Sequence, residues 1–593
     1  MDRQSTIGFV LIFIVLVAWM WLNSPQPKPK QPDNITKQEQ GKDTVKVVQP
    51  KAQEQKETQQ VDPYGKFFSA RASGKEKIIS IETDNYSAEI SSRGGVIRKW
   101  ELKKFKTWDG QPVQLIDYMH RGDFTVLLTT SDGRVINTKE LYFDVITSSS
   151  HVQLEGSFEF EATFILQATN GGQLVKKMKF RNGEYGFETE IQLLNLGSVV
   201  SNFQYEVAWE HGIRYAERNS VDESSFAAAY AFTANELTEI DASKVDQKIQ
   251  KEISGGIDWV ATRNKYFAVA LIPVGTVSEG AYLEGTRIAL PDNGSLESYG
   301  ISLKMPYKGE QSEKSIFKLF LGPLQHGELK SYGTSLEKIM SLGWAWLIRP
   351  ISEYIMLPIF TAIHYVIPNW GLVIIIFSIL IKVALHPLSK TQMKSMKKMQ
   401  KLQPLMDEMR EKYKDDPQKM NQSIMNLYKE YGVNPAGGCL PLLLQMPIMY
   451  ALYSVFRGAI ELRQASFVGW ITDLSIPDVI YRLSFKLPLI GIQDISGIAV
   501  LMGVTMFFQT KMTTKDPRQK AMVWMMPIMM TFLFNGFPAG LNLYYTVFNI
   551  LSIGQQLLIN KQHDDEPLRK IEPKKKTHGG IFKFAKDIPR LKK

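Results

Sequence analysis

Five predominantly apolar runs follow one another beyond residue 340 of this 593-residue chain. Several are short or contain Gly, Pro and Gln, which bundled membrane helices tolerate when their neighbours satisfy the polar groups. A sixth run, at 7–22, carries no charge and is followed by no small-residue cleavage site, which indicates an uncleaved signal anchor over residues 1–23. The pattern predicts a membrane protein with six transmembrane helices. The five later runs lie at 370–385, 439–460, 495–510, 521–536 and 541–559.

The charge of the connecting loops predicts the orientation of these helices. Loop 388–434 contains ten Lys and Arg residues, segment 511–520 four and tail 561–593 eleven, whereas loop 461–494 contains three and turn 537–540 none. Because basic loops are retained in the cytoplasm, this alternation places both termini there. The sequence therefore predicts a basic cytoplasmic tail at the end of the chain and an exported polar half before the later runs.

The exported half divides by composition into a tether and a β-rich domain. Residues 24–74 are rich in Pro, Gln and Lys with almost no aromatic residues, which is typical of a disordered linker. Residues 75–335 carry many short alternating runs between polar turns, for example 153–160, and predict a large antiparallel β-sandwich. Glu210 and His211 form a common surface pair, so a binding, spacing or docking role is favoured over catalysis.

Residues 340–368 differ from the later apolar runs. Apolar and aromatic positions are mixed there with Arg349, Glu353 and His364, and three prolines interrupt them. This mixture predicts an amphipathic helix that lies in the membrane interface before the second span.

Lys382 is the most informative single residue, because it lies inside an apolar run. It follows Trp370 by twelve positions, or about 18 Å along a helix. A lysine at such depth costs about 2.5–3.5 kcal/mol on insertion scales, so it is expected to face a wet cavity or a partner. Ser378, one turn earlier on the same face, favours a polar stripe inside the bundle. The alternative is a lysine that extends to the cytoplasmic end near His386.

A second polar stripe follows the last apolar run, where polar residues recur at steps of three and four. Gln445 and Gln509 add isolated amides in two other runs. Any of these residues is equally consistent with a role in holding helices together. No acidic residue in the runs neutralises Lys382, so the favoured partner is an acidic or hydrated stretch of another polypeptide. The stripe consists of Asn542, Tyr545, Asn549, Ser552 and Gln556.

Loop 388–434 predicts a cytoplasmic helical hairpin. Apolar residues recur at steps of three and four on both sides of a turn at Asp415-Asp416-Pro417. Methionines suit a surface that adapts to varied apolar sequences, and they are also common in cores. The first arm presents Met399, Met406 and Met409 on its apolar face and Lys394, Lys397 and Lys398 on its basic face.

Composition excludes several catalytic classes. The single cysteine, Cys439, allows neither an intramolecular disulfide nor a cysteine-rich zinc site, and the eight histidines form no pair at metal-ligand spacing. Neither a P-loop nor a dinucleotide-binding glycine motif occurs. We expect no enzyme activity, no metal and no cofactor. The net charge of +10 favours nucleic acid, the ribosome or an anionic membrane as a partner, without recognition of a specific nucleic-acid sequence.

Four motifs in the second half resemble the signatures of the YidC membrane protein insertase family. They are Asn-Pro-Ala-Gly-Gly-Cys-Leu-Pro-Leu-Leu-Leu-Gln-Met-Pro-Ile at 434–448, Glu-Leu-Arg-Gln-Ala at 461–465, Leu-Met-Gly-Val-Thr-Met-Phe-Phe at 501–508 and Gly-Leu-Asn-Leu-Tyr-Tyr at 540–545. The similarity is strongest over 340–560. The signal anchor, linker and exported domain resemble the Gram-negative form of the family more loosely.

The resemblance implies an inner-membrane insertase whose core, 369–560, encloses a hydrophilic groove. Insertion through this groove would need no nucleotide hydrolysis. Lys382 matches a position where familiar members carry arginine and attract the polar flank of an incoming protein. The hairpin would recruit substrates, and the basic tail would help dock the ribosome. The exported domain would be a periplasmic β-supersandwich similar to sugar mutarotases. The implied groove residues are Lys382, Ser378, Gln445, Gln509, Tyr544, Tyr545 and Asn549.

The implied partners are nascent membrane proteins, the ribosome, components of the Sec translocon and membrane lipids. One alternative is a secondary transporter or channel that uses Lys382, against which stand the missing inverted repeat and the single ionisable group in the apolar runs. Another is a passive translocon assembly factor that acts through the exported domain, which leaves the polar stripe around Lys382 unexplained.

Overall fold

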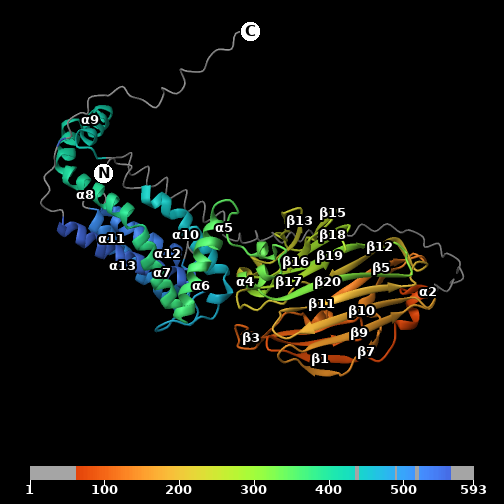
Figure 1. Ribbon diagram of the computed structural model, residues 1–593. Coiled ribbons are helices and arrows are strands. Elements are labelled where there is room, and N and C mark those ends of the chain that lie inside the picture. The colour runs from red at the N-terminus through yellow and green to blue at the C-terminus, as the bar shows by residue number, and fades with distance from the viewer. Residues whose placement is uncertain (1–61, 434–439, 488–490, 515–519, 563–569, 571–593) are drawn as a thin grey trace, which may run out of the picture.

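The computed structural model describes residues 62–433, 440–487, 491–514, 520–562 and 570. A large β domain adjoins a bundle of helices formed by the C-terminal half (Figure 1). The predicted signal anchor, and most of the predicted linker and basic tail, lie outside the described residues.

Three sheets with five, nine and six strands build the β domain. The five-stranded sheet has the order β4 (Pro112–Gln114), β3 (Val96–Lys106), β2 (Tyr86–Ser91), β1 (Ile78–Glu82) and β8 (His151–Gln153). The six-stranded sheet has the order β15 (Ile249–Ser254), β18 (Gly280–Leu290), β19 (Gly294–Pro306), β12 (Val200–Trp209), β5 (Thr125–Thr130) and β6 (Val135–Asn137).

The nine-stranded sheet runs through the middle of the domain. Its order is β14 (Glu236–Ile240), β13 (Ala228–Thr233), β16 (Trp259–Arg263), β17 (Phe267–Val274), β20 (Ser312–Pro323), β11 (Gly186–Leu194), β10 (Gln173–Arg181), β9 (Glu159–Gln167) and β7 (Asp144–Ile146). Its strands pair antiparallel, and β1 with β8 is a parallel pair. The expectation of a large, mostly antiparallel β domain is confirmed.

The alternating sequence pattern explains how these strands bury one face. Along β9, buried positions alternate with more exposed ones, because successive side chains of a strand point to opposite faces of the sheet. Tyr86 stacks on Trp100 in the core with 3.9 Å between ring centroids. The three largest fully buried side chains are Trp100, Trp209 and Trp259.

Two expectations about this domain are wrong in detail. The run 153–160 is not one strand, because β8 ends at Gln153, β9 begins at Glu159 and the intervening Phe158 is exposed. The predicted linker also extends too far. Its last part folds as α2 (Gly65–Phe68) and η1 (Ser69–Arg71), because Phe68 is fully buried in the core of the β domain.

Five helices of the C-terminal half coincide with the five later apolar runs. They are α7 (Trp370–Ala384), α10 (Leu440–Gly458), α11 (Gly497–Thr513), α12 (Lys520–Phe534) and α13 (Ala539–Gln562). Helix α13 packs against both α7 and α11, and α11 also packs against α12. Within the described ranges, no helix is by itself long and apolar enough to cross a membrane. Helices α7 and α8 (His386–Lys412), bent by 64° at their junction, meet that criterion together.

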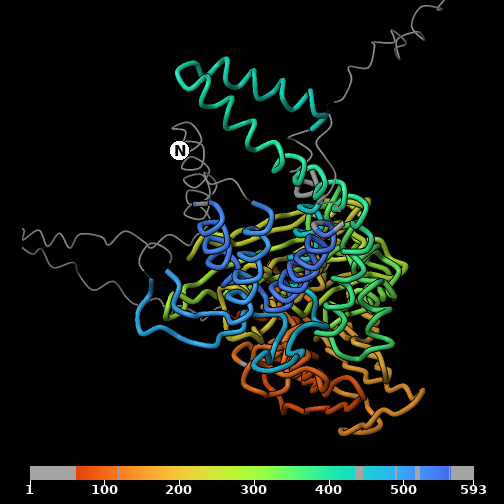
Figure 2. Tube along the Cα trace, turned by 90° about the vertical axis from the view of Figure 1, so that its left-hand side faces the viewer, coloured from red at the N-terminus to blue at the C-terminus, as the bar shows by residue number. Residues whose placement is uncertain are grey.

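Helix α8 and α9 (Pro417–Glu430) form a hairpin at the end of the bundle that points away from the β domain (Figure 2). The turn lies at the predicted place, because the side chain of Asp416 caps α9 by accepting a hydrogen bond from the Lys419 amide at 3.0 Å. An apolar cluster of Leu402, Met406, Leu427 and Val433 holds the two arms together.

The segment 340–368 is helical only in its second part. Helix α5 (Ile348–Ile351), the π-helical segment η6 (Ser352–Met356) and α6 (Leu357–Val366) follow one another without a break. This stretch is amphipathic, since Phe360 is buried while Tyr354 and Tyr365 are exposed. The buried Glu353 carboxylate lies 3.1 Å from Arg349 Nε and 3.3 Å from His326 Nε2, the latter in α4 (His326–Ser331).

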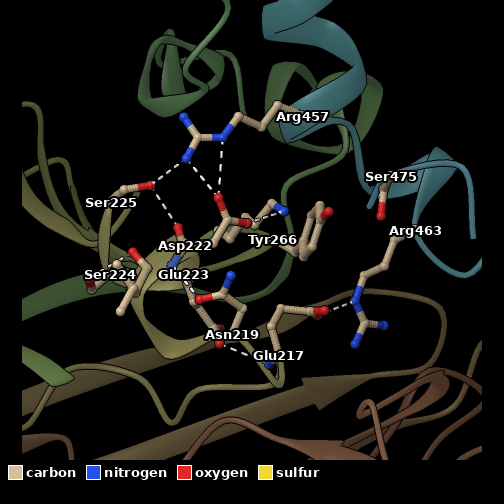
Figure 3. Close-up of polar contacts among 12 residues, drawn as sticks. Glu217, Asn219, Asp222, Glu223, Ser224, Ser225, Tyr266, Arg457, Arg463 and Ser475 are labelled. Carbon is tan, nitrogen blue, oxygen red and sulfur yellow. Dashed lines mark hydrogen bonds and ion pairs between the residues drawn. The ribbon is translucent and has the colours of Figure 1, made fainter. Parts of the chain in front are cut away.

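Ion pairs join the β domain to the helical bundle (Figure 3). Arg457, in the last turn of α10, donates to Asp222 Oδ1 at 2.7 Å and to Ser225 Oγ at 2.9 Å. Asp222 belongs to the short helix α3 (Ser220–Ser224) of the β domain. Arg463, beyond η8 (Ile460–Leu462), pairs with Glu217 at 2.6 Å. The two parts are therefore held in a defined arrangement. A small hairpin of β21 (Val479–Arg482) and β22 (Asp494–Ser496) completes the fold.

Candidate functional site

Helix α7 carries Lys382 into the bundle. The helix begins after Pro368, where the side chain of Asn369 accepts a hydrogen bond from the Leu372 amide at 3.0 Å. Lys382 lies in the last turn and is 8% exposed. Its ammonium donates to Ser552 Oγ at 2.6 Å and lies 4.4 Å from the ring centroid of Phe548. Both partners belong to α13, which favours an interior position over extension toward the cytoplasmic end.

The side chain of Lys382 lines a polar cavity of about 170 Å³ between the helices. Its polar lining comes from four different helices: Lys382 of α7, Gln445 of α10, Gln509 of α11 and Ser552 of α13. The first turns of α8 add Ser389 and Gln392 to this polar lining. Apolar side chains complete the wall, so a small polar space is enclosed by apolar helices. The apolar lining residues are Leu385, Leu388, Met393 and Phe548.

The cavity combines one ammonium group with amides and hydroxyls. Its lining contains no carboxylate, histidine or cysteine among the residues that the structure describes. Such a set offers hydrogen-bond donors and acceptors and a positive charge, and it offers no paired nucleophile and base. The arrangement is therefore suited to attracting an acidic or hydrated segment rather than to bond chemistry.

Four of the seven predicted groove residues lie outside this lining. Ser378 is fully buried, and its hydroxyl donates to the Ile374 carbonyl of its own helix at 2.7 Å. Asn549 donates to Thr505 Oγ1 at 3.3 Å and so links α13 to α11. Tyr544 and Tyr545 pack against aromatic rings, and their hydroxyls accept or donate no hydrogen bond within the described part of the chain.

Several lining residues were not predicted. Ser552, the direct partner of Lys382, belonged to the polar stripe of the last run, and its place on that face was the available signal. Ser389, Gln392 and Met393 follow a spacing of three and four, which places them on one face of α8. The sequence could not show that the bend between α7 and α8 brings this face to the cavity.

The hairpin presents its predicted residues unequally. Met399 and Met406 contribute to the apolar cluster between the arms, and Tyr428 donates a hydrogen bond to Met406 Sδ at 3.4 Å. Met409 is half-buried outside that cluster. Lys394 and Lys398 are exposed, whereas Lys397 is half-buried. Gln400 donates to the Thr513 carbonyl at 2.5 Å and ties the first arm to the end of α11.

Comparisons with known proteins cover both parts of the chain. A family model described as 60Kd inner membrane protein matches residues 362–566, and one described as YidC periplasmic domain matches residues 78–354. A protein of Chlorobaculum tepidum named membrane protein insertase YidC is 38% identical over 95% of this chain and 96% of its own length. The chain belongs to the YidC family.

A further curated relative agrees with this assignment. A membrane protein insertase YidC of Pelodictyon phaeoclathratiforme is 39% identical over 95% of each chain. The structure described as active YidC insertase with the first transmembrane domain resolved is 19% identical, covers 83% of this chain and 95% of that one, and has a TM-score of 0.35. The resemblance in the four motifs is thus confirmed. As a YidC-family chain, it is an inner membrane protein with a large all-β periplasmic domain.

Proposed function

We propose that this chain inserts membrane proteins into the inner membrane, and that the cavity around Lys382 receives the polar flank of the incoming protein. The observation that carries the proposal is the convergence of Lys382, Gln445 and Gln509 from three separate apolar helices on one polar space. The relatives carry the name membrane protein insertase, which favours insertion over the transporter and assembly-factor alternatives.

The proposed mechanism uses binding energy alone. A polar segment costs several kcal/mol to place in hydrocarbon, and a positive, hydrogen-bonding cavity inside the apolar bundle shortens the path over which that cost applies. The apolar helix of the substrate then leaves into lipid, where burial yields about 25 cal/mol per Å². For an acidic segment, the membrane potential adds about 2.3 kcal/mol per charge per 100 mV.

The membrane arrangement is part of the same proposal. Helices α7, α10, α11, α12 and α13 would form five spans, and the N-terminal run at 7–22 a sixth, with both termini in the cytoplasm. The bend between α7 and α8 supports it, because a span that ends near His386 leaves the basic hairpin on the cytoplasmic side. The amphipathic stretch 348–366 would then lie in the opposite interface.

The remaining predicted residues take secondary roles in this proposal. Tyr544 and Tyr545 would contact the substrate when the helices separate, since their hydroxyls have no partner in the described structure. The exposed Lys394 and Lys398 would recruit nascent chains at the ribosome. Contacts with the Sec translocon and with lipids are proposed on the resemblance to the family.

Insertion by the purified protein in liposomes tests the proposal. Lys382→Met should reduce the yield of an inserted substrate that has an acidic flank, and Lys382→Arg should retain most of it. Lys486→Met removes an exposed lysine from a connecting loop and serves as the matched control. Equal yields from wild type and Lys382→Met would contradict the proposal.

A further inference from the structure

A second cavity, of about 340 Å³, lies within the β domain. Its size reaches the lower end of the range of small-molecule sites. Unlike most such sites it is lined by charged and polar side chains. The lining consists of Glu76, Ser91, Arg93, Arg98, Arg121, Lys139 and Glu140.

Positive charge is in excess around this cavity. Four cationic side chains line it with two carboxylates, and three of these cations are already paired: Arg93 with Glu140 at 2.5 Å, Arg98 with Glu76 at 3.7 Å, and Lys139 with Glu210, outside the lining, at 3.8 Å. Arg121 forms no ion pair with any residue that the structure describes. Guanidinium groups bind carboxylate and phosphate oxygens in a bidentate fashion, so the surplus charge is suited to an anion.

Backbone segments approach one another closely beside the cavity. A Cβ atom at Gly94 would lie 2.7 Å from the Lys139 carbonyl oxygen, so only glycine allows the β2–β3 turn to approach the segment that carries Lys139. Arg121 itself has a φ of +60°, a conformation that costs free energy and clusters at functional sites. The lining cations are therefore held by a scaffold that depends on unusual backbone positions.

A buried lysine connects the backbone segments that carry the lining residues. The ammonium of Lys176, which is fully buried, donates to the carbonyls of Gly94 at 3.1 Å, Gly95 at 3.4 Å and Phe124 at 3.1 Å. It thereby links the β2–β3 turn to the segment that follows Arg121. No part of the proposed insertion mechanism uses this arrangement.

The cavity is remote from the helical bundle. Strand β3 connects them, since Arg98 near its start lines the cavity and the carbonyl of Lys106 at its end accepts a hydrogen bond from Arg463 at 2.5 Å. Eight residues of extended chain span up to about 26 Å at 3.3 Å per residue. A ligand would therefore reach the cavity from the solvent rather than from the lipid beside the bundle.

We propose that this cavity binds a small soluble anion that carries a carboxylate or phosphate group together with hydroxyl groups. Arg121 and Arg98 would hold the anionic group. Ser91, whose hydroxyl donates to Glu76 Oε1 at 2.6 Å, and the remaining lone pairs of Glu76 and Glu140 would accept hydrogen bonds from the hydroxyls of the ligand, because a carboxylate paired with one arginine keeps further acceptor sites.

Calorimetric titration of the full-length protein with inorganic phosphate and with citrate tests this site. The protein is placed in nanodiscs of neutral lipid at low ionic strength, and the titrations are repeated in nanodiscs of phosphatidylglycerol. Arg121→Gly is the main variant, because glycine adopts the positive φ at this position without strain. Arg98→Gln is the second variant, and Lys251→Gln, an exposed lysine of β15, is the control for net charge.

Saturable binding of at least one probe is expected, with a dissociation constant raised at least tenfold by Arg121→Gly and by Arg98→Gln and unchanged by Lys251→Gln. The absence of saturable binding with both probes would overturn the proposal, as would unchanged affinity in both arginine variants. Loss of binding in the phosphatidylglycerol discs alone that persists at high ionic strength, where the charge of the lipid surface is screened, would assign the cavity to lipid headgroups and overturn a soluble ligand.

Discussion

The contact between the β domain and the helical bundle allows a quantitative prediction, because one carboxylate forms ion pairs with two cations. Asp222 Oδ1 accepts from Arg457 at 2.7 Å, and Asp222 Oδ2 accepts from Lys265 Nζ at 2.7 Å. The Lys265 side chain is only 2% exposed, whereas those of Asp222 and Arg457 are 27% and 31% exposed. The two cations therefore depend on Asp222 to different degrees.

Substitution of Asp222 and substitution of Arg457 should therefore lower the free energy of unfolding by different amounts. Asp222→Asn leaves the buried Lys265 without its counter-charge, which costs about 3–5 kcal/mol of unfolding free energy. Arg457→Gln leaves the pair of Asp222 and Lys265 intact and removes only charged hydrogen bonds at a partly exposed site, which costs about 1 kcal/mol. In the double variant, the cost of Arg457→Gln should nearly vanish, giving a coupling energy of about 1 kcal/mol.

Chemical unfolding of the full-length protein, followed by tryptophan fluorescence, measures these costs, since Trp100, Trp209 and Trp259 report on the β domain. Asp246→Asn, a change at an exposed aspartate of the same domain, is the control. An Arg457→Gln variant as unstable as Asp222→Asn would refute the reasoning, because it would mean that the contact to the bundle rather than the buried lysine sets the cost.

The pH dependence of this contact follows from the same geometry. Burial alone would raise the pKa of Asp222, but Lys265 and Arg457 outweigh it and hold the pKa below its ordinary value. A lowered carboxyl pKa contributes stability that is complete above the pKa of the unfolded chain, near 3.9, and that is lost as the pH falls through the folded value. The contact should therefore be insensitive to pH between about 5 and 8 and weaken only in acid.

Three further predictions concern other parts of the chain. Burial lowers the pKa of Lys176 to about 7, so above that pH the unfolded chain binds more protons than the folded chain. The free energy of unfolding should therefore rise by up to about 1.4 kcal/mol per pH unit from about pH 7.5 to 9.5. Lys176→Met should remove this slope. Phe68→Ala should cost about 3–5 kcal/mol in chemical unfolding if the segment before β1 belongs to the domain, whereas a loss below 1 kcal/mol would show that it does not. Ser552→Ala should lower insertion yield less than Lys382→Met, because the ammonium remains in the cavity; the reverse order in a liposome assay would contradict this.

Much of the helical half could be predicted, because apolar runs bounded by polar loops directly determine which residues are helical. The run predicted at 370–385 forms a helix over Trp370–Ala384, and the run at 521–536 forms one over Lys520–Phe534. Lys382 stood out for the same reason, since a charge in an apolar run needs a specific environment. The polar stripe on the last run contained its actual partner, Ser552.

The composition of the cavity could not be predicted, because it depends on how each helix is rotated about its axis. Ser378 and Lys382 are one turn apart on α7, yet Ser378 bonds its own backbone while Lys382 reaches α13. The contact of Arg457 with Asp222 joins residues 235 positions apart and has no local signal. The end of the predicted linker was misplaced because single aromatic residues such as Phe68 carry no periodicity, although they bury fully.

Site-specific photo-crosslinking from the wall of the cavity tests the insertion account most directly. A photo-reactive amino acid at Gln509 lines the cavity, and the same group at the neighbouring Phe508, which is exposed on the outside of α11, is the matched control. Ribosome-held nascent membrane proteins should form adducts with position 509 while their polar flank is entering, and Lys382→Met should weaken these adducts. Adducts at position 508 but none at 509, for any nascent chain length, would contradict the account.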